Sequence, residues 1–138
     1  MRRTSGPARP NVVDSSAWLA YFAEEPSAAD FAAAIEETRR LVVPAVCLLE
    51  VFKVVVRQRG EGAALQAVAV MQQGEVVDLD ASLALAAAGA GLAHKLPLAD
   101  SIVYATARAT GGIVWTQDDD FEGLPDVRYV PKRRGKSL

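Results

Sequence analysis

The 138-residue sequence contains one cysteine, one histidine and no long apolar run. The single cysteine, Cys47, cannot form an internal disulfide, and its apolar neighbours predict a small buried side chain. The single histidine, His94, leaves too few partners for a zinc site or for a serine-histidine-aspartate triad. The sequence lacks the roughly 20 consecutive apolar residues that span a bilayer, and no apolar segment follows the arginines near its start. We therefore expect a cytoplasmic protein with no membrane partner.

An excess of positive charge is also lacking, because 15 lysines and arginines are outnumbered by 17 aspartates and glutamates. A protein that holds nucleic acid through bulk charge would be basic. The cations instead gather at the end of the chain, where residues 132–138 contain Lys132, Arg133, Arg134 and Lys136 and no acid. Two interpretations are open for this tail: a solvated segment, or an arm that contacts phosphate or a partner.

Short apolar runs alternate with amphipathic stretches along the chain, which is typical of βαβ units. We predict strands at residues 11–13, 41–43, 76–79, 113–116 and 128–130. We predict helices between them at residues 15–22, 28–38, 45–59, 61–73, 81–95 and 98–110. The pattern predicts an α/β fold, a three-layer α/β/α sandwich around a short, mostly parallel five-stranded sheet.

One domain accounts for most of the chain, since neither an internal repeat nor a low-complexity linker divides it. Hydrophobic residues make up 51% of the sequence, which suits a single core at this length. We assign residues 11–131 to the domain, residues 1–10 to an N-terminal extension and residues 132–138 to the basic C-terminal tail.

Four acidic residues stand where a parallel sheet could bring them together. Asp14 ends the first predicted strand, and Asp118 lies just beyond the fourth. Glu50 and Asp100 lie in apolar helical segments, and Glu50, flanked by large apolar residues, would need a partner or a metal if it were buried. Ligands bind outside the carboxyl ends of the strands in such sheets, so the four carboxylates could converge there.

Each of these acids also has a purely structural interpretation. Asp14 could cap the helix that follows it, and Asp100 could favour the positive end of its own helix. Asp118 could belong to a solvated turn, and Glu50 could reach water from a helix edge. Thr116 is open in the same way, since its hydroxyl could orient a water or a phosphate or the residue could simply end a strand.

A carboxylate cluster would indicate a divalent cation, because crowded acids repel one another unless a cation lies between them. Mg²⁺ and Mn²⁺ are hard ions that prefer oxygen ligands. One or two such ions can make hydroxide from bound water and stabilise the attacking and leaving oxygens of a phosphodiester. This chemistry needs no serine, cysteine or histidine nucleophile.

Four segments, in order along the chain, carry a family resemblance. The segment Leu-Pro-Leu-Ala-Asp-Ser at residues 96–101 and the strand and turn Val-Trp-Thr-Gln-Asp-Asp-Asp-Phe at residues 114–121 resemble the hallmark segments of PIN domains of the VapC toxin type. The opening Val-Val-Asp-Ser-Ser at residues 12–16 resembles that family's first strand. Glu50 matches the position of the family's glutamate. The resemblance covers about residues 11–130.

This resemblance implies a PIN-like fold and a Mg²⁺- or Mn²⁺-dependent endoribonuclease, the toxin of a toxin–antitoxin pair. It implies that Asp14, Glu50, Asp100 and Asp118 hold the metal, with Asp120 as an auxiliary acid. It also implies a homodimer and a cognate antitoxin that covers the acidic site. The chain departs from the family in the ten residues that precede its first predicted strand.

Two alternatives remain at this point. The first is a PIN-fold binding module without catalysis, which would have no need for a self-repelling carboxylate cluster. The second is another α/β phosphoryl-transfer domain. A haloacid-dehalogenase-like enzyme would have a second aspartate two residues after Asp14, where Ser16 stands. A receiver domain could use Asp78 or Asp80 but would also need paired acids after the first strand.

Overall fold

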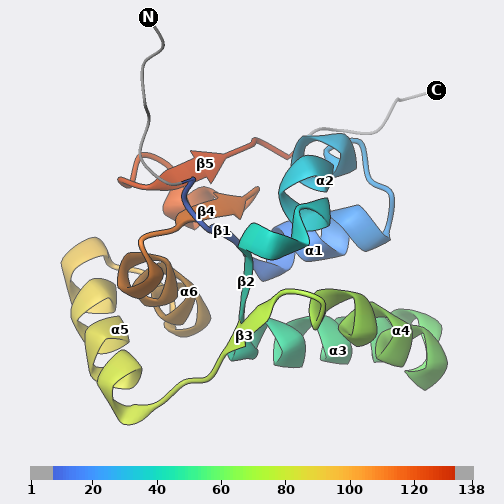
Figure 1. Ribbon diagram of the computed structural model, residues 1–138, viewed down its shortest axis with the longest axis horizontal. Coiled ribbons are helices and arrows are strands. Elements are labelled where there is room, and N and C mark those ends of the chain that lie inside the picture. Colours follow the sequence, from blue (N-terminus) through green and yellow to red (C-terminus); the bar gives the residue numbers. More distant parts are fainter. Residues whose placement is uncertain (1–7, 133–138) are drawn as a thin grey trace, which may run out of the picture.

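The computed structural model describes residues 8–132, which fold around one parallel sheet (Figure 1). Its strands are β1 (Asn11–Val13), β2 (Leu41–Pro44), β3 (Glu75–Val77), β4 (Ile113–Thr116) and β5 (Val127–Tyr129). The strand order is β3-β2-β1-β4-β5, and all four neighbouring pairs are parallel. The predicted five-stranded sheet is confirmed. It was expected to be mostly parallel, and within these residues it is wholly parallel.

Helices cover both faces of this sheet. Figure 1 shows α1 (Ser15–Phe22), α2 (Ala28–Glu36), α3 (Ala45–Arg59) and α4 (Glu61–Met71) on one side. On the other side lie α5 (Ala81–His94) and α6 (Leu98–Thr110). The chain passes from β1 to β2 to β3 in one direction across the sheet and then returns to β4 and β5 in the other. Right-handed crossovers therefore place the two sets of helices on opposite faces, which confirms the three-layer sandwich.

The reversal of direction lies between β1 and β4, which are neighbours. The chain continues from β1 toward β2 and from β4 toward β5, in opposite directions across the sheet, so the two connections diverge beyond the carboxyl ends of these strands. Crevices at such switch points are where open α/β sheets bind ligands. This is the edge where Asp14 and Asp118 lie.

Some element boundaries differ from those predicted. Helix α2 ends at Glu36, and a short 3-10 helix, η1 (Thr38–Arg40), leads into β2. Strand β3 covers residues 75–77 rather than 76–79, because it pairs with β2 from Glu75 onward. Gly74 lies so close to β2 at this point that a Cβ atom there would lie 2.6 Å from the Leu41 side chain.

The core lies on both faces of the central strands. Val12 and Val13 of β1 and Val43 of β2 have no exposed surface, as expected for strands buried on both sides. The largest buried side chains are Trp18, Phe31, Tyr104 and Phe121. A smaller cluster of Leu83, Ala87, Ile102 and Ala105 joins α5 to α6. Cys47 is buried in the main core, as the sequence predicted.

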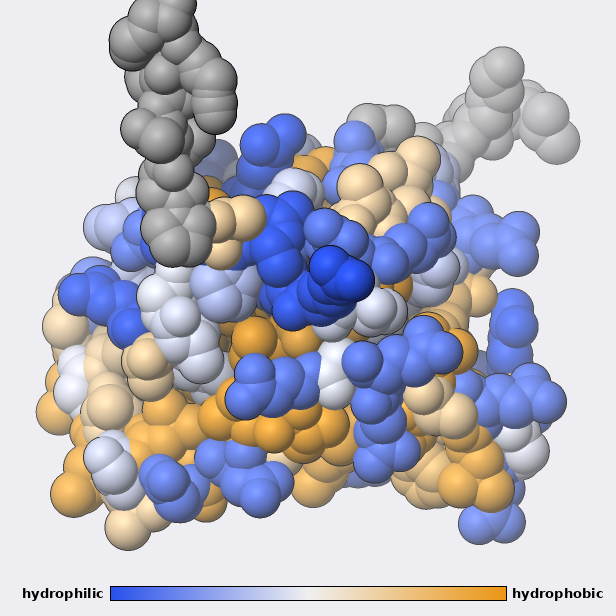
Figure 2. All heavy atoms as spheres, in the orientation of Figure 1, coloured by the Kyte–Doolittle hydropathy of each residue, from blue (hydrophilic) through white to orange (hydrophobic). Residues whose placement is uncertain are grey.

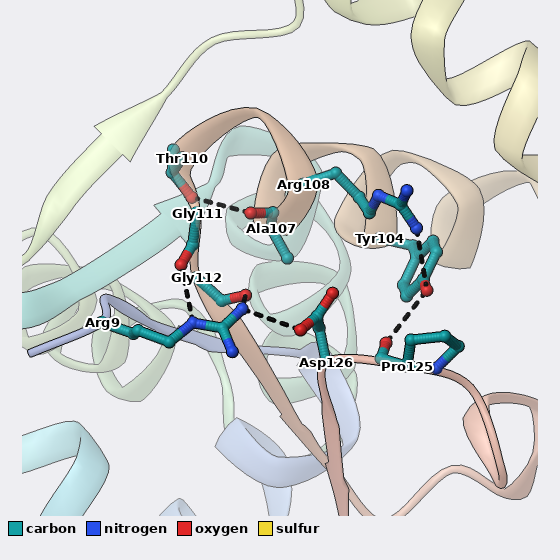
Figure 3. A network of polar contacts seen from close by, with 9 residues as sticks. All are labelled: Arg9, Tyr104, Ala107, Arg108, Thr110, Gly111, Gly112, Pro125 and Asp126. Carbon is teal, nitrogen blue, oxygen red and sulfur yellow. Dashed lines mark hydrogen bonds and ion pairs between the residues drawn. The ribbon is translucent and has the colours of Figure 1, made fainter. Parts of the chain in front are cut away.

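At the amino ends of the strands, Arg9 joins three segments of the chain (Figure 3). Its guanidinium donates to the carbonyl oxygens of Gly111 and Gly112 at 3.0 Å each and to the Asp126 carboxylate at 2.9 Å. The two glycine carbonyls follow the last turn of α6, where cations are favourable. Arg9 belongs to the segment that the sequence assigned to an N-terminal extension, yet it contacts the folded domain. We call Arg9, Gly111, Gly112 and Asp126 the Arg9 network.

Within residues 8–132, no helix has both the length and the apolar character needed to cross a membrane.

Candidate metal centre

Three acids converge at the carboxyl ends of β1 and β4. Asp14 directly follows β1, Asp118 lies two residues after β4, and Asp100 lies in the first turn of α6. Each offers a carboxylate oxygen, and these three oxygens all lie within 4.8 Å of one another. Asp14 and Asp100 are 86 positions apart in the sequence, and the sheet and α6 bring them to one site. We call Asp14, Asp100 and Asp118 the acid triad.

Asp14 is the most tightly held of the three. Its Oδ1 accepts hydrogen bonds from Ser16 Oγ at 2.7 Å and from the Ala17 amide at 3.2 Å. Its Oδ2 accepts from Thr116 Oγ1 at 2.9 Å. Asp14 therefore caps α1, as its structural interpretation proposed, and also belongs to the acid triad. Its side chain is buried, so these bonds fix the carboxylate in one orientation.

The electrostatics of the acid triad are unfavourable without a cation. Burial and, to a smaller extent, the charge of Asp118 raise the pKa of Asp14 to about 6, although its hydrogen bonds act to lower it. Burial followed by the charges of Asp118 and Asp14 raises the pKa of Asp100 to about 8. For Asp14, this rise in pKa means that the fold disfavours the ionised form by about 3 kcal/mol. The described chain supplies no lysine or arginine partner to these carboxylates.

Glu50 lies at the margin and does not belong to the group of oxygens within 4.8 Å. It lies on α3, and its Oε1 accepts a hydrogen bond from Ser15 Oγ at 2.6 Å. Ser15 begins α1 directly after Asp14, so this hydrogen bond holds Glu50 next to a residue that adjoins the acid triad. The structure therefore brings three of the four expected acids into direct proximity and places the fourth beside them.

The turn after β4 adds further acids. Asp118 caps the short helix η2 (Asp119–Phe121), since its Oδ1 accepts from the Asp120 amide at 2.9 Å. Oxygens of Asp118, Asp119 and Asp120 also lie within 4.8 Å of one another. Asp119 and Asp120 are exposed. Asp120, expected as an auxiliary acid, thus lies close to Asp118 but is not one of the three acids of the triad.

Thr116 has different partners from those expected of a hydroxyl that orients water or phosphate. It is fully buried, donates to Asp14 and accepts from the Asp118 amide at 2.9 Å. One hydroxyl therefore links two members of the acid triad. Ser16 and Ser15, to which sequence reasoning assigned no chemistry, support Asp14 and Glu50. The signal that could have identified them is a hydroxyl one or two residues after a helix-capping aspartate.

A site made only of carboxylate oxygens suits a hard divalent cation. Mg²⁺ and Mn²⁺ prefer oxygen ligands and keep several waters when bound to a few carboxylates. A cation between Asp14, Asp100 and Asp118 would favour their ionised forms and remove the repulsion that raises their pKa values. The donor set, its spacing and its uncompensated charge all fit such an ion.

Comparison with known proteins supports the fold. The sequence matches the family model described as PIN domain over residues 12–127. No curated protein matches it significantly. A toxin–antitoxin complex from Klebsiella pneumoniae is similar in fold, with a TM-score of 0.71 and 19% identity over 86% of this chain and 95% of that one.

Two further solved structures share the fold. VapC20 of Mycobacterium tuberculosis, described as a toxin that cleaves the sarcin–ricin loop, has a TM-score of 0.71 and 22% identity over 85% of this chain and 96% of its own. DNA-bound VapBC of Salmonella typhimurium has a TM-score of 0.67 and 19% identity over 91% of this chain and 100% of its own.

Proposed function

Because the chain belongs to the PIN-domain family, we propose that it is a metal-dependent endoribonuclease that hydrolyses RNA phosphodiester bonds. The observation that carries the proposal is the acid triad, whose oxygens from three distant segments lie within 4.8 Å of one another. A fold without catalytic or metal-binding function gains nothing from a partly buried group of mutually repelling carboxylates.

Asp14, Asp100 and Asp118 are the proposed direct ligands of Mg²⁺ or Mn²⁺. Glu50 lies outside the 4.8 Å group, so we assign it a contact through a metal-bound water, which these ions retain. When bound, the ion supplies activation of a water molecule and neutralisation of charge on the phosphate. Thr116 and Ser16 hold the Asp14 carboxylate in place, and Asp120 adds negative charge at the rim.

Protons and metal compete for this site. Asp14 and Asp100 have pKa values raised to about 6 and about 8 without metal. Each carboxyl must lose its proton to become a ligand, so metal affinity rises with pH through this range.

We further propose that the protein is the toxin of a toxin–antitoxin pair. The similar structures from Klebsiella pneumoniae and Salmonella typhimurium are described as toxin–antitoxin and VapBC complexes. An apolar groove between α1, α3 and α4, lined in part by Phe22, Val55 and Val70, suits an amphipathic segment of an antitoxin.

A homodimer is the proposed assembly. Leu49 of α3, Leu79 after β3 and Leu85 of α5 are 58%, 46% and 76% exposed. Figure 2 shows an apolar stretch along the lower part of the molecule, where α5, β3 and α3 lie. Contiguous exposed apolar surface of this kind is typical of protein–protein contacts.

The test of the proposed activity is cleavage of RNA by purified, antitoxin-free protein in EDTA, Mg²⁺ or Mn²⁺. We expect cleavage that requires the metal. Folded protein that neither cleaves a panel of structured RNAs nor binds Mn²⁺ in calorimetry would instead support the non-catalytic binding module.

A further inference from the structure

An open cavity borders the acid triad on the side of β5. Residues from the Asp118 turn and from the end of β5 line it: Ser16, Gln117, Asp118, Asp119, Tyr129, Pro131 and Lys132. Asp118 is therefore shared between the triad and this cavity. A polymer whose phosphate reaches the triad must extend beyond it, and the cavity is a neighbouring surface on which its next nucleotide can lie.

Strand register places Tyr129 on the same face of the sheet as the triad. Tyr129 pairs with Thr116 across β4 and β5, and the Thr116 hydroxyl contacts Asp14. Side chains of paired residues in neighbouring strands point to the same face, and the next residue points to the opposite one. Arg128 follows this rule, since its guanidinium lies 5.2 Å from the ring centroid of Trp115, its own partner in register.

The half-buried side chain of Tyr129 lines this cavity. No aromatic ring among residues 8–132 stacks on it, whereas Trp18, Tyr21 and Phe22 pack against one another. Desolvation and the charges of Glu122, Asp119 and Asp118 raise the pKa of Tyr129, so its phenol stays neutral beside these acids. A neutral aromatic ring beside a phosphodiester site is suited to stacking on a nucleobase.

Lys132 supplies the charge that the cavity otherwise lacks. Asp118 and Asp119 repel a phosphate backbone, and Lys132 is the cation that lines the cavity within the described part of the chain. It lies three residues after Tyr129 and is exposed, so its ammonium group can neutralise a phosphate next to a stacked base.

We propose that Tyr129 and Lys132 form the binding edge for single-stranded RNA, with a base beside the scissile bond stacked on Tyr129 and its phosphate contacting Lys132. A base in a duplex is already stacked and cannot use this ring, which gives the site its preference for unpaired nucleotides. The inference rests on the proposed ribonuclease function and assigns the residues that bind the nucleotide next to the scissile bond.

The experiment measures RNA binding without cleavage. The parent is Asp100→Asn protein in Mg²⁺, and the probe is a short fluorescein-labelled RNA of mixed sequence, single-stranded or annealed to its complement. Fluorescence anisotropy gives Kd for each form. We expect the parent to prefer the single strand, Tyr129→Ala to weaken that binding about 10-fold and Tyr129→Phe to keep it. Lys132→Ala should reduce the salt dependence of log Kd by about 0.7.

Arg128→Ala is the matched control, because it removes one positive charge from the opposite face of β5. We expect it to leave single-strand binding unchanged. Equal losses in Arg128→Ala and Lys132→Ala, or unchanged binding by Tyr129→Ala, would overturn the inference. If wild-type protein still cleaves RNA in that case, the proposed function survives and the cavity is left to another ligand, such as a protein partner. A parent that binds no RNA, from a wild type that cleaves none, would overturn both.

Discussion

Two polar clusters lie at opposite ends of the same sheet and differ in how their charges are balanced. The Arg9 network, at the amino ends of β4 and β5, pairs one cation with one carboxylate and with two carbonyls. The acid triad, at the carboxyl ends of β1 and β4, gathers three carboxylates, and no cation from residues 8–132 pairs with them. Hydrogen bonds hold Arg9 in the first cluster and Asp14 in the second. Only the second leaves a net charge that something else must neutralise.

This contrast separates a structural cluster from a functional one. The Arg9 network is complete within the chain and stabilises the fold by joining three segments. The acid triad weakens the metal-free fold, because ionising buried acids costs free energy that their hydrogen bonds do not fully offset. A group of like charges that destabilises the fold, and that a ligand of opposite charge would neutralise, is a good indicator of a binding site.

The largest expected effect comes from removing one carboxylate of the triad. Asp100→Asn should reduce metal-dependent RNA cleavage at least about 100-fold, because it removes a ligand from a site that works through charge. The measurement is the initial cleavage rate in Mg²⁺ and in Mn²⁺. Asp78→Asn, which removes the same charge from an exposed position after β3, is the control and should retain wild-type activity. Equal rates for wild type and Asp100→Asn would show that the triad is not the catalytic site.

A second prediction concerns the hydroxyl that links Asp14 to the Asp118 amide. Thr116→Val keeps the shape of the side chain but removes the hydrogen bonds of the hydroxyl to Asp14, to the Asp118 amide and to Ser16. It should weaken Mn²⁺ binding about 10-fold or more. Isothermal titration calorimetry measures the affinity directly. Thr106→Val removes an equally buried hydroxyl that bonds only to the Ile102 carbonyl within α6, so it should bind Mn²⁺ normally. If both variants lose affinity to the same degree, the Thr116 hydroxyl has no special role.

The third prediction sharpens the contrast through pH. The folded-state pKa values of Asp14 and Asp100, about 6 and about 8, lie above the ordinary value of 3.8. The unfolded chain therefore loses these protons at lower pH, and stability falls as pH rises through the folded pKa values. In EDTA, we expect the melting temperature to fall by roughly 6 °C between about pH 5 and about pH 8.

The same melting series contains its own controls. Asp100→Asn should show a smaller fall because one of the two titrating groups is gone, and saturating Mn²⁺ should reduce the fall in wild type. A metal-free melting temperature that rises across this pH range would contradict the electrostatic account of the triad.

The smallest expected effect comes from the balanced cluster. Arg9→Ala should lower the free energy of unfolding by about 1 kcal/mol, or roughly 3 °C in melting temperature, because the ion pair with Asp126 is partly exposed and the glycine carbonyls can turn to water. Cleavage at low temperature should be unchanged, since Arg9 lies at the other end of the sheet. A loss of activity without a loss of stability would show that the two ends are coupled.

The sequence was sufficient to predict the order of the elements and the identity of the acids. Apolar runs bounded by proline, glycine and charged residues locate β1, β2 and β4, because a strand buried on both faces needs continuous hydrophobic residues. The sequence predicted the limits of the edge strands less reliably. Strand β3 and strand β5 each begin one residue earlier than predicted, because their limits depend on pairing with a neighbour rather than on their own composition.

Tertiary structure alone decided how the acids are arranged. The sequence names Asp14, Glu50, Asp100 and Asp118 together, but only the folded chain separates a triad within 4.8 Å from a glutamate held beside it through Ser15. It also decided that the Thr116 hydroxyl is used by Asp14 and that Tyr129 shares a face with the triad. The physical reason is range: hydrophobic pattern and capping act over a few neighbouring residues, whereas distances between carboxylates depend on strand order, register and helix packing across the whole domain.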